Sequence, residues 1–221
     1  MNWTEQIDIY CERTDFTYWS EPVNAVTNAA FLIAAFIMWR RLQGTNLPLA
    51  NLLVAILTAI GIGSFLFHTH ATGWAATADV VPIGLFILAY LFAVGLHFLD
   101  LRWGWALALT LAFIPYAALL VPLLDRLPFF NISNFYWTVP ILLFAFAPIV
   151  ARRGSRGTAW GMALGGLILC LSITLRSIDM PICETLPLGT HFLWHCLNGV
   201  MLGWMIEVYR RHMVGKGHAA G

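Results

Sequence analysis

Charged residues are scarce in this sequence of 221 residues. Lysine, arginine, aspartate and glutamate together make up 10% of it, whereas a soluble domain contains about 25%. Hydrophobic residues make up 60%, and the mean hydropathy is +0.76. This composition excludes a water-soluble globule, a nucleic-acid-binding protein and a disordered scaffold. It predicts an all-α polytopic membrane protein.

Cysteines are also few. Four in a sequence of this length do not make a disulfide scaffold. The polar, acidic N-terminus lacks the basic start and apolar stretch of a secretory signal peptide. We therefore expect one domain over residues 1–221. It would have a short acidic N-terminal segment, residues 1–21, and a basic C-terminal tail, residues 210–221.

Apolar runs separated by short polar punctuation predict a bundle of seven transmembrane helices, since a span needs about 20 residues. No soluble domain fits between these runs. The predicted spans are residues 22–39, 50–69, 79–98, 104–124, 134–151, 159–176 and 188–209.

Basic residues in the short connections set the orientation of such a bundle, because they are retained in the cytoplasm. With the N-terminus outside and the C-terminus cytoplasmic, nine basic residues lie inside and three outside. The compact chain favours a bacterial inner membrane. The inner residues are Arg40, Arg41, Arg102, Arg152, Arg153, Arg156, Arg210, Arg211 and Lys216, and the outer ones are Arg13, Arg126 and Arg176.

Ionisable groups inside membrane spans are costly and are therefore functional candidates. Ser64 and His68 are four residues apart and share one helix face, as do His191 and His195. Asp79 begins the third predicted span. The second span ends on the outer side, and the third and seventh begin there. We therefore expect these side chains to meet near the outer surface.

Three neutral imidazoles with one open position are typical of a catalytic zinc site, which predicts His68, His191 and His195 as ligands. A nearby aspartate can accept a proton from water and return it to a leaving group. A serine can donate a hydrogen bond to a developing oxyanion. His70 lies off the Ser64 face and is a weaker candidate ligand. The alternative is that the paired histidines are hydrogen-bonded core residues.

The same residues resemble the pattern of the alkaline ceramidases, in the wider CREST group of seven-span hydrolases. The resemblance extends from about residue 8 to residue 209. The matching residues are Ser64-x3-His68, Asp79 eleven residues later, His191-x3-His195, the run from Tyr10 to Glu12 and the run from Ser20 to Asn28.

This resemblance implies a zinc-dependent amidase that cleaves the N-acyl bond of ceramide to a sphingoid base and a fatty acid. The three histidines would hold zinc, Asp79 would be the acid and base, and Ser64 would assist. The expected partners are ceramide or a related N-acyl lipid and the lipid bilayer. We expect no nucleic acid and no obligate protein partner.

The resemblance also implies a calcium site in the N-terminal segment, with Asp8, Glu12 and Glu21 as its ligands, because carboxylate oxygens suit Ca²⁺. Ile9 and Thr14 depart from the family's pattern, which has Asp and Asn at these positions.

Two other functions are compatible with the sequence. One is a receptor-like protein of the same superfamily, similar to the progestin and adipoQ receptors, with a mainly structural zinc. The other is a small transporter or channel, whose polar groups would be spread through the membrane depth. The short terminal segments and the N-terminal acidic motif favour the enzyme, and the polar groups gather at one end.

Two cysteines, Cys11 and Cys183, fall outside the membrane under this topology. Because the outer side is oxidising, we predict that they pair and hold the loop before the seventh span near the metal site. Cys170 and Cys196 lie within spans, where we expect small buried hydrophobic residues.

Overall fold

The computed structural model describes residues 2–219, with side chains up to residue 216. Within this range the long elements are all helices, and the extended pairing is limited to one isolated bridge between Gln6 and Thr72. The helices are α1 (Pro22–Thr27), α2 (Ala29–Leu42), α3 (Pro48–His70), α4 (Gly73–Ala93), α5 (Trp103–Leu111), α6 (Phe113–Leu124), α7 (Asn134–Arg152), α8 (Arg156–Ser177) and α9 (His191–Ala219).

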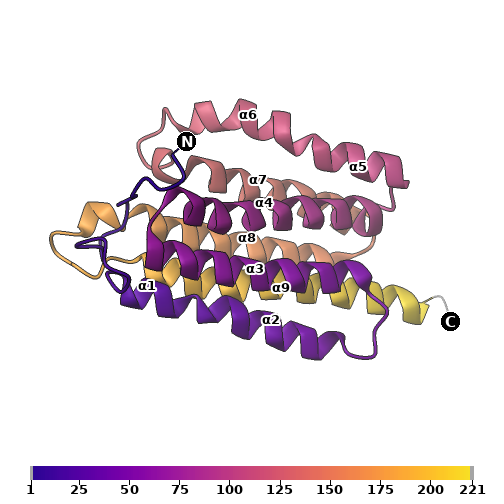
Figure 1. Cartoon of the computed structure of the whole chain (residues 1–221). Coiled ribbons are helices and arrows are strands. Elements are labelled where there is room, and N and C mark those ends of the chain that lie inside the picture. The colour runs from indigo at the N-terminus through magenta and orange to yellow at the C-terminus, as the bar shows by residue number, and fades with distance from the viewer. Residues whose placement is uncertain (1, 220–221) are drawn as a thin grey trace.

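The helices run lengthwise beside one another (Figure 1). The most extensive packing joins α3 to α4, α7 to α8 and α8 to α9, while α2 packs against both α3 and α9. α5 and α6 lie along one edge of the bundle (Figure 1). The site described below forms where the ends of α3 and α9 meet α1.

Six segments of the described chain are long and apolar enough to cross a membrane, and they correspond to the first six predicted spans. The predicted helical membrane bundle is therefore confirmed. α9 is not among the six, because its apolar residues are interrupted by His191, His195, Asn198 and Glu207. Its 29 residues exceed the ~20 needed to span a bilayer. The seventh span stays a prediction.

Three predicted boundaries differ from the structure. α4 begins at Gly73, so Asp79 lies inside the helix, and the alanines before it favour helix. The fourth span is divided at Ala112, since Pro115 has no N–H to bond to Leu111. Residues 210–219 of the predicted tail continue α9, while 220–221 lie outside the described residues.

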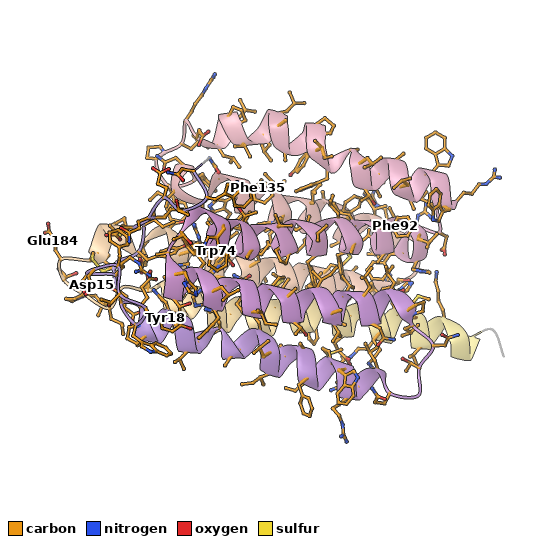
Figure 2. The ribbon with its side chains drawn as sticks, viewed as in Figure 1. Asp15, Tyr18, Trp74, Phe92, Phe135 and Glu184 are labelled. Carbon is orange, nitrogen blue, oxygen red and sulfur yellow. A yellow bond between two sulfur atoms is a disulfide. The ribbon has the colours of Figure 1, made fainter. Side chains whose placement is uncertain are left out.

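The N-terminal segment folds across the end of the bundle instead of extending away from it. Its main chain bonds to the α3–α4 turn, where Ile7 N–H donates to the Ala71 carbonyl. A disulfide joins Cys11 to Cys183 in the loop before α9, which confirms the predicted pairing. Asp15 and Glu184 accordingly lie at the same end of the bundle, opposite Phe92 (Figure 2).

The arrangement generates a prediction about orientation, because the first and last described residues lie at opposite ends of the bundle (Figure 1). We expect the N-terminus outside and the C-terminus in the cytoplasm, as the basic residues predict. A reporter active only in the cytoplasm, fused to either end, should give signal at the C-terminus alone. Equal signals from both fusions would contradict a bundle with an odd number of spans.

Candidate metal centre

Three histidines converge at the end of the bundle that the N-terminal segment covers. His68 lies in the last turn of α3, and His191 and His195 lie in the first turns of α9. All three are buried, and their ring centroids are 4.6 to 5.1 Å apart. One ring nitrogen of each lies within 4.8 Å of the others. The predicted convergence of these residues is confirmed.

The facing nitrogens need a partner that the protein does not supply. His68 Nε2, His195 Nε2 and His191 Nδ1 are buried without a hydrogen-bond partner among the described residues. Buried polar atoms are normally satisfied, and leaving them unpaired costs free energy. Three imidazole nitrogens are a donor set that binds transition metals. The residues therefore fit a metal ion.

The remaining ring nitrogens of two histidines are held by residues at the two ends of α1. Glu21, directly before α1, places Oε2 2.5 Å from His68 Nδ1. Thr27, at its last turn, places Oγ1 3.0 Å from His195 Nδ1. Such contacts fix the orientation of a metal-binding imidazole and leave the other nitrogen free for the metal.

His191 is held in a different way, by stacking against Tyr10 of the N-terminal segment. The two ring centroids are 3.7 Å apart and the ring planes differ by 22°. Burial raises the pKa of the Tyr10 phenol above its usual value, although Arg176 acts in the opposite direction. Tyr10 is therefore a neutral aromatic cover over the histidine cluster.

Asp179 joins the N-terminal segment to the start of α9. Its Oδ1 accepts hydrogen bonds from the main-chain N–H groups of Thr190 and His191, at 2.6 and 2.8 Å. Its Oδ2 accepts from Cys11 N–H at 2.9 Å. One carboxylate thus satisfies N–H groups at the start of α9, which have no intrahelical partners.

Gly189 allows this close approach. Its φ of +66° is unfavourable for other residues, and a Cβ atom there would lie 2.1 Å from Asp179 Oδ1.

Ser64 and Asp79 are brought together by a close contact between α3 and α4. A Cβ atom at Gly63 would lie 2.0 Å from the Ala78 carbonyl oxygen, so the helices touch there through main chain. The Ser64 hydroxyl and the Asp79 carboxylate are within hydrogen-bonding reach, and Asp79 interacts electrostatically with His68. The structure therefore places both predicted residues beside the histidines.

His70, the weaker candidate ligand, lies outside the cluster. It is exposed, and its ring contacts those of Tyr18 and Trp74, with centroids 5.3 and 5.1 Å away.

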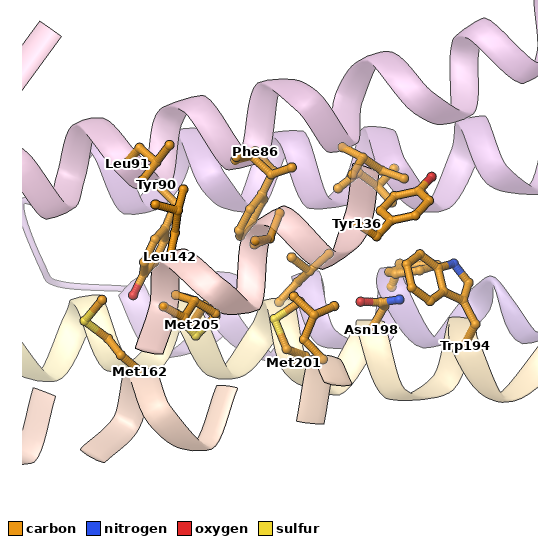
Figure 3. Close-up of a pocket in the computed structure, with 18 of the residues that line it drawn as sticks. Phe86, Tyr90, Leu91, Tyr136, Leu142, Met162, Trp194, Asn198, Met201 and Met205 are labelled. Carbon is orange, nitrogen blue, oxygen red and sulfur yellow. The ribbon is translucent and has the colours of Figure 1, made fainter. Parts of the chain in front are cut away.

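An apolar cavity extends from Ser64 and Asp79 into the bundle. Its walls come mainly from α3, α4, α7, α8 and α9. Figure 3 shows Trp194 and Tyr136 at one end, and Tyr90 and Met162 at the other. The two candidate reaction residues thus face the start of a long apolar space.

The predicted calcium ligands do not share one site. Both oxygens of Glu12 accept main-chain N–H groups at the start of α1, from Val23 and Asn24. Burial raises the pKa of Glu12, although these two hydrogen bonds oppose it. Asp8 is exposed.

Glu21 is occupied as well. Burial tends to raise its pKa, but the hydrogen bond to His68 and the charge of Arg13 outweigh this and lower it. Its Oε1 lies 2.5 Å from Arg13 Nε, while its Oε2 bonds to His68. A calcium ion takes six to eight oxygen ligands. In this arrangement Asp8, Glu12 and Glu21 do not fit one.

The sequence alone assigned no role at the site to four individual residues around the histidines: Tyr10, Arg13, Thr27 and Asp179. Three of them lie in segments without helical periodicity, where sequence spacing does not indicate contacts. One signal was available for Arg13, which is a cation in an otherwise acidic segment.

Comparison with known families finds a match over nearly the whole chain. The model of the family described as Ceramidase matches residues 3–216, which include every residue of the centre described above. A comparison with curated proteins finds no relative of significant similarity. Because the family match covers nearly the whole chain, this protein belongs to the ceramidase family.

Proposed function

We propose that the protein is a zinc-dependent amidase that hydrolyses the N-acyl bond of ceramide within the membrane. Membership of the ceramidase family supports hydrolysis of this lipid class. The observation that carries the finer proposal is the position of the histidine cluster. It lies beside Ser64 and Asp79, which both line the apolar cavity.

His68, His191 and His195 would hold the zinc ion, because three histidines with an open fourth position are a common catalytic zinc set. The bound ion supplies Lewis acidity, which polarises the amide carbonyl and makes water nucleophilic near neutral pH. Glu21 and Thr27 would keep two of the imidazoles in the binding orientation, through the contacts to their Nδ1 atoms.

Asp79 would move the proton in this reaction. Its carboxylate accepts a proton from the attacking water as the water oxygen bonds to the carbonyl carbon. It then gives that proton to the amide nitrogen, the C–N bond breaks, and a fatty acid and a free amine result. The Ser64 hydroxyl donates a hydrogen bond to the developing oxyanion.

The cavity would hold the apolar part of the substrate. Asp79 and Tyr90 both line it from α4, and their separation of eleven residues along the helix corresponds to about 16 Å. The length and apolar walls suit a hydrocarbon chain. The polar head would remain near the N-terminal segment, where the polar side chains gather.

The proposal is tested by incubating purified protein with a panel of N-acyl lipids and measuring the released fatty acid. We expect cleavage of ceramide, loss of activity with a zinc chelator and recovery on adding zinc. A protein that binds zinc but cleaves no lipid in the panel would contradict the amidase and favour the receptor-like alternative.

Single substitutions should separate metal binding from proton transfer. Asp79→Asn should keep zinc and lower kcat by about 10²–10⁴-fold, because it removes the proton acceptor. Ser64→Ala should keep zinc and lower kcat by about 10²-fold. Replacement of His68, His191 or His195 by Ala should remove both zinc and activity.

Metal content and fatty-acid release are measured on the same samples. His70→Ala is the control, because this exposed histidine lies outside the cluster and should retain both properties. Wild-type turnover in Asp79→Asn would contradict the mechanism even with zinc present.

The far end of the cavity should limit chain length. Tyr90 is buried there, and its hydroxyl has no hydrogen-bond partner among the described residues. Tyr90→Ala should extend the cavity and raise the rate for longer acyl chains relative to shorter ones. Tyr90→Phe keeps the ring and is the matched control, with an unchanged preference. Identical chain-length profiles for both variants would show that Tyr90 does not bound the chain.

A further inference from the structure

Arg13 is a buried cation beside the histidine cluster. The residue is 5% exposed, and its side chain lies between the N-terminal segment and the end of α3. Its guanidinium group donates to three oxygens in different directions. These are Glu21 Oε1 at 2.5 Å, the Asp15 carbonyl at 3.0 Å and the His68 carbonyl at 3.1 Å.

The contact with α3 suits a positive charge. The last four carbonyl groups of a helix have no intrahelical partner, and the helix dipole places partial negative charge there. The His68 carbonyl belongs to this last turn, because α3 ends at His70. Arg13 therefore satisfies a group at the end of the helix that carries one of the candidate metal ligands.

Arg13 also acts on His68 through Glu21. One oxygen of the Glu21 carboxylate bonds to Arg13 and the other to His68 Nδ1. A carboxylate in this position fixes the histidine and tunes its affinity for the metal. Because Arg13 holds the opposite oxygen, the orientation of Glu21 against His68 depends on Arg13.

The oxygens around Arg13 are of the type that a calcium ion would require. A carboxylate and two main-chain carbonyls surround the guanidinium group. Of the nearby side-chain oxygens, Asn24 Oδ1 is buried without a partner, but a single amide oxygen is far short of six to eight ligands. An arginine carries five N–H donors and a permanent charge, so it can satisfy several such oxygens itself.

We propose that Arg13 is the built-in cation of the metal centre. Its guanidinium group takes the place of a separate calcium ion and positions Glu21 against His68. High metal affinity then needs no calcium. Arg13 is thus a positioning residue, and this role rests on the proposed zinc site.

The test measures how fast a chelator removes zinc from purified protein, without substrate. Arg13→Ala should lose zinc about 10–100-fold faster than the wild type, the range expected when a residue supporting a ligand is removed. Arg13→Lys should lose zinc at a rate between those of the wild type and Arg13→Ala, because an ammonium group keeps the charge but lacks the planar fork of the guanidinium group. Arg126→Ala, in an exposed outer loop, should match the wild type.

Added cations distinguish positioning from general destabilisation. Guanidinium ion, far below denaturing concentrations, or calcium should slow zinc loss from Arg13→Ala by refilling the space beside Glu21. Neither cation should change the rate of zinc loss from the wild type. If Arg13→Ala does not fold, the rate of zinc loss from Arg13→Lys is compared with that of the wild type, and equal rates contradict the proposal.

Three results would overturn the proposal. They are wild-type zinc loss in Arg13→Ala, failure of both cations to slow its loss, and slower loss from the wild type on adding calcium. A wild type that holds zinc but cleaves no N-acyl lipid would instead contradict the amidase function, so the two failures are distinguishable.

Discussion

The rest of the structure depends on three buried imidazoles that turn unpaired nitrogens toward one another. Burying such groups without a partner is costly, and the helices alone do not hold them. The supporting contacts come from the first 27 residues. Glu21 and Thr27 fix His68 and His195, and Tyr10 covers His191. The disulfide and Asp179 tie this segment to the start of α9.

The sequence was sufficient for the parts of the molecule that periodicity and topology control. Apolar runs located the helices, and the i, i+4 spacing of the histidines, combined with antiparallel spans, predicted where they meet. The pairing of Cys11 with Cys183 followed from the same topology. The beginning of α4 was missed because Gly73 to Ala78 contain few strongly apolar side chains, although the alanines among them favour helix.

The contacts of the N-terminal segment could not be predicted in the same way. This segment has no repeating pattern, and its partners are distant in sequence. Asp179, for example, bonds to Cys11 across 168 residues. Glu21 was assigned to calcium by the family resemblance, whereas in the structure Arg13 and His68 share its carboxylate. Whether a carboxylate faces a metal ion or an arginine depends on packing that spacing does not reveal.

Metal holding and proton transfer are supported by different parts of the fold. The histidines depend on the N-terminal segment and α1, while Ser64 and Asp79 depend on the main-chain contact of α3 with α4 at Gly63. Since these contacts share no residue, a change in the N-terminal segment should act first on metal affinity. A change at the α3–α4 contact should act first on turnover.

His68 lies one helical turn beyond Ser64 on α3, so this helix fixes the position of the histidine cluster relative to Ser64 and Asp79. The cavity begins beside Ser64 and Asp79. The amide group of a bound lipid would therefore reach both the histidines and these two residues only where the apolar bundle meets the polar N-terminal segment.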